Sequence, residues 1–232
     1  MNIADQIYQL GLVKPVLDRG GSIHPLIIPA DKTNGTGLMN PSIYVDNGLL
    51  LCNIRHVNYT LYHSENKKFQ HRYGPLQYLH PENDRHLRTW NYLAILNEDL
   101  TIKQIIDIDT SKFDQEPLWE FVGLEDGRLF RWDNKMYLCG VRRDTTTNGQ
   151  GRMELSELHV KTDLVREIKR TRIPAPGAND TYCEKNWMPI VDKPYRFVKW
   201  SMPTEVVWAN PEQPETKTVV LTQTPPAPRD QR

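Results

Sequence analysis

Three short segments of the chain carry ionisable side chains next to strand-like apolar runs. They are residues 123–128 (GLEDGR), residues 142–144 (RRD) and residues 184–187 (EKNW). Carboxyl groups can transfer protons, and Arg or Lys can bind an anion such as phosphate. The combination indicates a site for acid/base chemistry that is assembled from neighbouring β-hairpins.

The first segment places two carboxyl groups, Glu125 and Asp126, next to each other. In an extended strand, adjacent side chains point to opposite faces. We therefore expect one of the two to face the site while the other anchors the backbone. Gly123 and Gly127 bracket the pair and would permit a close backbone approach or a β-bulge. The alternative interpretation is an ordinary solvated turn.

The second segment follows a predicted strand that ends at Val141. Arg142 and Arg143 can each bind a phosphate or carboxylate through the two-pronged guanidinium group. The sequence does not distinguish which of the two faces the site. The alternative interpretation is a structural ion pair with Glu125 or Asp144.

The third segment offers three different kinds of contact. Lys185 supplies a mobile positive charge, Asn186 supplies both a donor and an acceptor, and Trp187 supplies an apolar platform for the face of a sugar ring. The alternative is a charged strand start followed by a core Trp. Polar groups in two upstream segments have the same character, and they add four candidate binding residues: Arg55, Asn58, Arg88 and Asn91.

Strand-like runs separated by turn signals account for most of the chain. Pairs of runs occur over residues 43–54, 90–108, 128–141 and 187–199, and single runs over residues 57–63, 154–160, 205–208 and 216–222. In the first pair, Asn47-Gly48 accepts the positive φ angles of a tight turn. This pattern predicts an all-β protein, either a sandwich or a propeller. The repeated order of polar segment, strand, turn and strand favours the propeller.

The bulk composition excludes several classes of protein. The 232 residues contain 29 Lys plus Arg and 29 Asp plus Glu, so no positive excess is present for bulk binding of nucleic acid. The three cysteines form no Cys-x-x-Cys pair, which argues against a metal site and for buried free thiols. There is no signal-peptide pattern and no apolar run of about 20 residues, so a cytoplasmic protein without a membrane span is expected.

The expected organisation has three parts. Residues 1–39 form a lead-in that is irregular apart from a short amphipathic helix over residues 2–10. Residues 40–222 form β-propeller blades. Residues 223–232 form a Pro-rich tail or the truncated start of a further blade.

The motif Gly-x-Glu-Asp-x-Arg, an Arg one hairpin later, and Lys-Asn shortly before Pro resemble the five-bladed β-propeller superfamily of carbohydrate-active enzymes. The nearest resemblance is to its inverting mannoside phosphorylase and β-mannosidase branch and to the related mannosyltransferases. The Asn-Pro-Ser sequence at residues 40–42 fits the same group. Two positions depart from the pattern. Gly127 stands where the usual motif has Pro, and Lys199-Trp200 stands where many phosphorylases have His-Arg.

The resemblance implies roles for individual residues. Asp126 would be the general acid, and Arg128 a cation that organises the site. Arg142 or Arg143 would bind phosphate or substrate, and Lys185 would add a contact to an anion or a hydroxyl group. No cofactor is implied beyond inorganic phosphate as a co-substrate, or a sugar nucleotide or sugar phosphate as the donor of a transferase.

The sequence therefore predicts a carbohydrate-active enzyme that acts on the glycosidic bond of an oligosaccharide or glycan by hydrolysis or phosphorolysis. A phosphorylase needs one acid and a cationic clamp, because phosphate is already an anion, whereas many glycosidases use two carboxyl groups. The alternatives are a glycosyltransferase of the same superfamily and a non-catalytic sugar-binding module. About three blades are expected within residues 40–222, against five in the superfamily, so a truncated chain is expected. The oligomeric state is left open.

Overall fold

The computed structural model describes residues 11, 13–33, 36–59, 84, 86–177 and 181–223. These residues form mainly β-strands, together with a short helix, α2 (Val13–Leu17), and a 3-10 turn, η1 (Ala30–Lys32). The prediction of an all-β fold is confirmed. The helix predicted over residues 2–10, part of the strand predicted over residues 57–63, and residues 224–232 lie outside the described residues.

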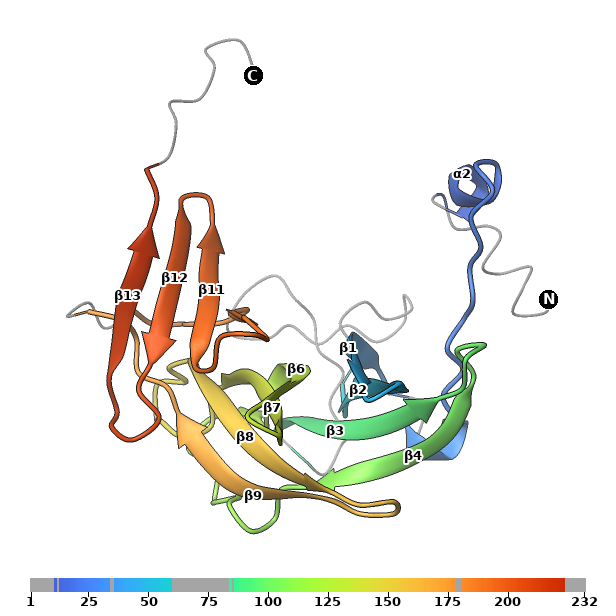
Figure 1. Cartoon of the computed structure of the whole chain (residues 1–232). Coiled ribbons are helices and arrows are strands. Elements are labelled where there is room, and N and C mark those ends of the chain that lie inside the picture. The colour runs from blue at the N-terminus through green and yellow to red at the C-terminus, as the bar shows by residue number, and fades with distance from the viewer. Residues whose placement is uncertain are drawn as a thin grey trace.

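The strands form three antiparallel meanders of four strands each (Figure 1). The first meander consists of β1 (Leu38–Asp46), β2 (Leu49–Val57), β3 (Leu87–Leu96) and β4 (Ile102–Asp109). The second consists of β6 (Glu125–Trp132), β7 (Lys135–Arg142), β8 (Arg152–Val160) and β9 (Val165–Arg172). The third consists of β10 (Met188–Pro189), β11 (Arg196–Ser201), β12 (Thr204–Ala209) and β13 (Thr216–Leu221).

The first two meanders are joined into one nearly closed, barrel-like sheet. At one edge β4 pairs in parallel with β9. At the other edge β1 lies beside β6, where the backbone N–H of Leu129 donates to Ser42 Oγ at 3.1 Å and Arg131 forms an ion pair with Asp46 at 2.6 Å. A short strand, β5 (Phe121–Val122), pairs in parallel with β3 just before β6 begins. The start of β6 is therefore tied to the first meander.

Turn residues explain why the predicted hairpins form where they do. Asn47 and Gly48 join β1 to β2 with φ angles of 49° and 82°, and Asp133 and Asn134 join β6 to β7 with φ angles of 45° and 64°. Asn, Asp and Gly adopt this left-handed conformation more readily than other residues. The hairpins predicted over residues 43–54, 90–108 and 128–141 are confirmed by the pairing of β1 with β2, β3 with β4, and β6 with β7.

Two parts of the strand prediction differ from the structure. The strand β9 was not predicted, because it is mostly charged and lacks an apolar run. It is stabilised by Val165 and Glu167, which are both fully buried. The strand predicted to start at Trp187 is shorter in the structure, where β10 contains only Met188–Pro189.

Apolar cores fill the spaces between consecutive meanders. Trp132, Trp187 and Phe197 belong to a core between the second and third meanders. Leu93 and Leu129 belong to a core between the first and second. A third core covers the other face of the first meander, where partly buried side chains of the lead-in, Leu26 and Ile28, pack against it.

The cysteines are free, as the sequence predicts. Cys52 and Cys139 are fully buried, and burial raises the pKa of both thiols, that of Cys52 to about 11. Cys183 is partly exposed. The two buried thiols therefore act as small apolar core groups.

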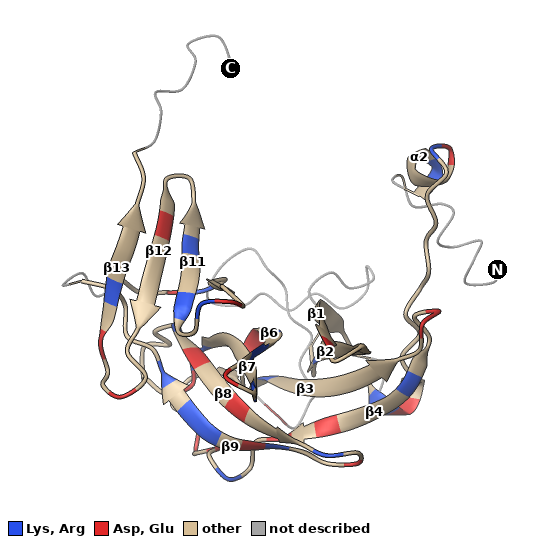
Figure 2. Ribbon diagram, viewed as in Figure 1, with Lys and Arg blue, Asp and Glu red and all other residues tan. Residues whose placement is uncertain are grey.

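Charged residues are distributed over all three meanders. Figure 2 shows basic and acidic positions interleaved along β8 and β9. In the part of the chain that the structure describes, no helix has the length and apolar character needed to cross a membrane.

Gly140 in β7 is required by the close approach of β6. A Cβ at this position would lie 2.3 Å from the carbonyl oxygen of Glu125. We expect Gly140→Ala to reduce the free energy of unfolding by about 1–3 kcal/mol, because the backbone has to move apart. Gly11→Ala is the matched control, since a Cβ at Gly11 meets none of the described residues within 4 Å. Urea denaturation measures both changes, and equal losses for the two variants would contradict the steric argument.

Candidate functional site

A β-bulge at the start of β6 positions the two adjacent carboxyl groups. Glu125 pairs with Val141 and Arg128 pairs with Cys139, so β6 has one residue more than β7 in this interval. Asp126 has a φ of 55°, in the left-handed region. This backbone conformation directs the Asp126 side chain toward the same guanidinium that the Glu125 side chain contacts. The expectation that they point to opposite faces is therefore wrong, because the segment is bulged rather than extended.

The guanidinium that they share belongs to Arg55 on β2. Its Nη1 donates to Asp126 Oδ1 at 2.6 Å, and its Nη2 donates to Glu125 Oε2 at 3.3 Å and to the Tyr59 hydroxyl at 3.0 Å. Thr89 Oγ1 accepts from Nε and Nη2, each at 3.3 Å. The Arg55 side chain is only 5% exposed. Burial by itself would lower the pKa of Arg55, but the nearby negative charges outweigh burial and raise it.

The two carboxyl groups have different surroundings. Glu125 Oε1 is buried and has no hydrogen-bond partner among the described residues. Burial raises the pKa of Glu125, and the charges of Arg55, Arg143 and Lys185 only partly oppose this. The Asp126 side chain is more exposed, at 24% against 16% for Glu125, and its Oδ1 also accepts from Asn40 Nδ2 at 2.6 Å. Glu125 is thus the more desolvated of the two carboxyl groups. Asp126 accepts two hydrogen bonds and remains partly exposed to solvent.

Arg143 is the arginine of the second segment that acts on this pair, since its charge lowers the pKa of Glu125. Its guanidinium lies over the rings of Phe121 and Tyr182, at 5.9 and 5.8 Å from their centroids, and donates to Cys183 Sγ at 3.2 Å. The charge of Lys185, which is exposed, acts on Glu125 in the same direction. Besides Arg55, the cations whose charge acts on Glu125 are therefore Arg143 and Lys185.

Arg142 occupies a different environment. It is 4% exposed and forms ion pairs with Asp144 at 3.3 Å and with Glu154 at 2.8 Å. The structural ion pair with Asp144 that the sequence left open is present. A substrate- or phosphate-binding role at the carboxyl pair is not supported for Arg142, because protein carboxylates already neutralise it.

The predicted sugar platform at Trp187 is wrong. Trp187 is completely buried, packs near Phe197, and donates its Nε1–H to Glu184 Oε2 at 3.1 Å. The alternative interpretation as a core Trp is correct. The preceding residue, Asn186, is exposed and adopts a φ of 62°.

Asn58 and Asn91 have structural partners. Asn58 donates to the carbonyl of His86 at 3.0 Å and accepts from the backbone N–H of Arg88 at 2.7 Å, so it clamps the start of β3. Asn91 donates to the carbonyl of Leu124 at 2.9 Å and accepts from Asn53 at 3.0 Å. Asn91 therefore fixes the backbone immediately before Glu125.

Among the described residues, the other two predicted arginines form no ion pair with Glu125 or Asp126. Arg88 pairs with Asp84. Arg128 follows the bulge, and its Nε is buried without a hydrogen-bond partner among the described residues. No contact among the described residues joins Arg128 to the carboxyl groups, so its role in organising the site stays a prediction.

Sequence reasoning missed several residues that build the site. Asn40, Tyr59 and Thr89 contact the Arg55–carboxyl cluster directly. Asn40 lies 86 positions before Asp126. Only the pairing of distant strands brings these residues together, so no local pattern could have identified them.

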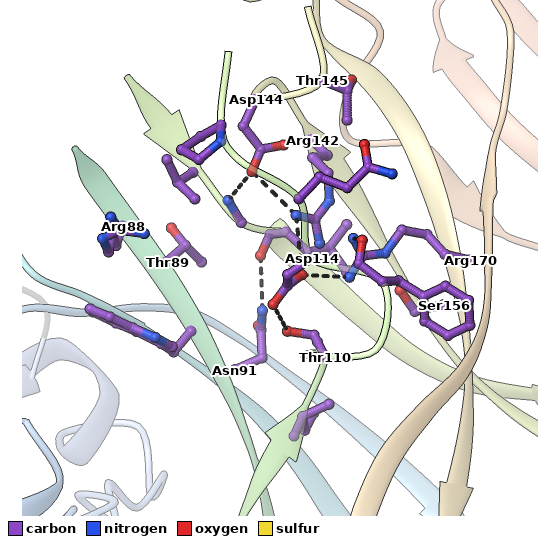
Figure 3. A pocket seen from close by; sticks show the side chains of 18 of the residues that line it. Arg88, Thr89, Asn91, Thr110, Asp114, Arg142, Asp144, Thr145, Ser156 and Arg170 are labelled. Carbon is purple, nitrogen blue, oxygen red and sulfur yellow. Dashed lines mark hydrogen bonds and ion pairs between the residues drawn. The ribbon is translucent and has the colours of Figure 1, made fainter. Parts of the chain in front are cut away.

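A separate cavity of about 270 Å³ lies between the first and second meanders (Figure 3). Three predicted site residues line it, namely Arg88, Asn91 and Arg142. Glu125 and Asp126 are not part of its lining. The structure thus places some of the predicted residues at the carboxyl pair and others around this cavity, whereas Asn58 and Trp187 belong to neither.

Comparison with protein-family models, with curated proteins and with solved structures gives no match to this chain. Among the described residues, no group of three or more His, Cys, Asp and Glu side chains is arranged to hold a metal ion.

The shared guanidinium gives the site a testable pH dependence. We expect Arg55→Met to reduce the free energy of unfolding by about 3–5 kcal/mol near neutral pH, because two partly buried carboxylates lose their counter-ion. Without Arg55, the pKa of Glu125 rises further above its unfolded value. The destabilisation should therefore be small below the unfolded pKa and grow as pH rises through the folded one.

Urea denaturation at about pH 4 and about pH 8 measures this difference. Arg131→Met is the matched control, because the Arg131 side chain is 29% exposed against 5% for Arg55, so the loss of its pair with Asp46 should cost less, about 1 kcal/mol. Equal losses for Arg55→Met at both pH values would contradict a charge-pairing role.

Proposed function

We propose that this protein is a carbohydrate-active enzyme that acts on a glycosidic bond, with Glu125 and Asp126 at its catalytic centre. One observation carries the proposal. The two carboxyl groups share a buried guanidinium, and burial raises the pKa of Glu125, whose side chain is 16% exposed against 24% for Asp126. In glycosidases, different environments keep one carboxyl group protonated as the proton donor and its partner ionised.

The meanders support the proposed propeller fold. Each is a four-stranded antiparallel sheet, which is the usual form of a propeller blade. The first strands of the first two, β1 and β6, lie side by side and supply Asn40 and Asp126 to the same cluster. In a propeller, the inner strands of neighbouring blades meet around the axis in this way. We propose that the three meanders are blades of the five-bladed type that the Gly-x-Glu-Asp-x-Arg motif resembles.

The proposed reaction breaks the bond between C1 of a sugar and the glycosidic oxygen. The leaving oxygen takes a proton from a carboxyl group, and a nucleophile attacks C1 from the opposite face, which inverts the configuration. The resemblance assigns the proton donor to Asp126, whereas the raised pKa makes Glu125 the carboxyl group that keeps its proton to higher pH. Arg143 and Lys185 would hold inorganic phosphate as the nucleophile; in a hydrolase, water would attack instead and give up its proton to a base on that face of the sugar.

The same cations favour a second candidate, a glycosyltransferase. A sugar phosphate or sugar nucleotide donor carries a phosphate group that Arg143 and Lys185 could bind. Asp126 would then accept the proton of the acceptor hydroxyl. The two candidates differ in the substrate that is consumed, so one assay separates them.

Asp126→Asn tests the catalytic assignment. Asn also tolerates a positive φ, so the backbone should be unaffected. We expect turnover of a β-linked mannobiose to fall at least about 100-fold while sugar binding is retained. Asp133→Asn is the matched control, because Asp133 also has a positive φ but lies in the exposed β6–β7 turn.

Product analysis with and without inorganic phosphate, and with mannose 1-phosphate as a donor, separates phosphorolysis, hydrolysis and transfer. Unchanged turnover in Asp126→Asn would remove this residue from the mechanism. Sugar binding by the wild-type protein without turnover under any of these conditions would identify a binding module instead.

Because the pKa of Glu125 is raised, we expect the kcat/KM for phosphate to fall on the alkaline side of the pH profile. Below this pKa the carboxyl group is neutral, and Arg143 and Lys185 attract the anionic substrate. As pH rises through the pKa, the new negative charge should weaken anion binding and raise the KM for phosphate. Glu125→Gln, which stays neutral, should abolish this rise. An unchanged fall in Glu125→Gln would show that another group causes it.

A further inference from the structure

The cavity between the first and second meanders has the features of a built binding site. The start of β3 forms one wall, and the ends of β7, β8 and β9 form another (Figure 3). Residues 110–118, which connect β4 to β5, close a third side. Gln115 and Thr145 line the cavity and are exposed, so it communicates with solvent.

The connecting segment is held in place by a network of charged groups around Arg170, which is 12% exposed. Arg170 donates to the carbonyl of Phe113 at 2.7 Å and to Asp114 Oδ1 at 2.8 Å, and it also pairs with Glu167, whose side chain is completely buried. Thr110 Oγ1 donates to Asp114 Oδ2 at 2.8 Å. These contacts keep the wall in one position, as expected for a preformed site.

The charges that line the cavity are balanced. Its lining includes three arginines and three carboxylates: Arg88, Arg142, Arg170, Asp114, Glu116 and Asp144. The two most buried arginines already have protein partners, since Arg142 pairs with Asp144 and Arg170 pairs with Asp114. A charged ligand would have to compete with these ion pairs. A neutral ligand leaves them intact.

One buried carboxylate oxygen remains without a partner. Asp144 is 7% exposed, and its Oδ2 accepts from the backbone N–H of Gly123 at 2.9 Å and from Arg142 at 3.3 Å. Its Oδ1 is buried and has no hydrogen-bond partner among the described residues. An unpaired buried acceptor is costly, so the site favours a ligand that carries a hydroxyl or amino donor.

We propose that this cavity binds a neutral polyhydroxyl molecule of the size of one sugar ring, separately from the Glu125–Asp126 centre. The volume of about 270 Å³ is just below the range of roughly 300–1,000 Å³ that is usual for drug-sized ligands, which fits a ligand of one ring. The polar lining offers partners for hydroxyl groups, and Leu124, Leu138 and Leu158 offer an apolar surface for C–H groups. The proposal does not depend on the proposed enzymatic activity.

Ligand-observed NMR with D-mannose, D-glucose and glycerol as probes tests the proposal on the full chain. We expect saturation transfer to at least one of the two sugars and a weaker effect with glycerol. Asp144→Asn should weaken sugar binding about tenfold, because a charge-assisted hydrogen bond is lost.

A matched pair of threonines keeps the test valid if Asp144→Asn does not fold. Thr145 and Thr147 are both exposed, but only Thr145 lines this cavity. Thr145→Trp should abolish binding by filling the entrance, while Thr147→Trp should bind like the wild type. Absence of binding by all three probes, equal binding by the two Trp variants, or a soaked crystal with only ordered water in the cavity would overturn the proposal.

Discussion

A buried guanidinium needs negative charge close to it, and this requirement organises the region between the first two meanders. Arg55 lies in β2 with a 5% exposed side chain, so leaving it unpaired would be strongly destabilising. The start of β6 supplies Glu125 and Asp126, and the bulge with its positive φ at Asp126 allows both to reach the same group. Gly123 and Gly140 permit the close backbone approach that this arrangement demands. The unusual backbone at Asp126 is therefore coupled to the pairing of Arg55.

The two interfaces between meanders differ in character. The second and third meanders pack mainly through aromatic side chains, including Trp132, Trp187 and Phe197. The first and second share an apolar core, but beside it Arg55 of β2 pairs with Glu125 and Asp126 of β6, and Arg142 pairs with Glu154 within the second meander. Burial raises the pKa of Glu154 despite the nearby arginines. Buried ion pairs contribute little net stability, so we expect binding sites at the polar interface between the first and second meanders.

Local patterns were sufficient to predict the hairpins, because Asn47-Gly48 and Asp133-Asn134 encode their turns directly. They failed for β9, whose pairing depends on a buried Glu167 and its partners rather than on apolar periodicity. At the candidate site, residue types identified Glu125, Asp126 and Arg55. Local patterns could not predict which of these side chains come together, because that depends on the bulge in β6 and on contacts from distant strands. Trp187 shows the same limit, since burial in a core depends on the packing of another meander.

The accessibility of the three thiols has a practical consequence. Cys52 and Cys139 are fully buried and their raised pKa values disfavour the reactive thiolate, whereas Cys183 is partly exposed and lies 3.2 Å from the Arg143 guanidinium. The folded protein thus offers one preferred position for an alkylating dye or spin label, without any engineered substitution. Such a reporter would sit next to a cation of the candidate site and could follow its occupancy by fluorescence or magnetic resonance.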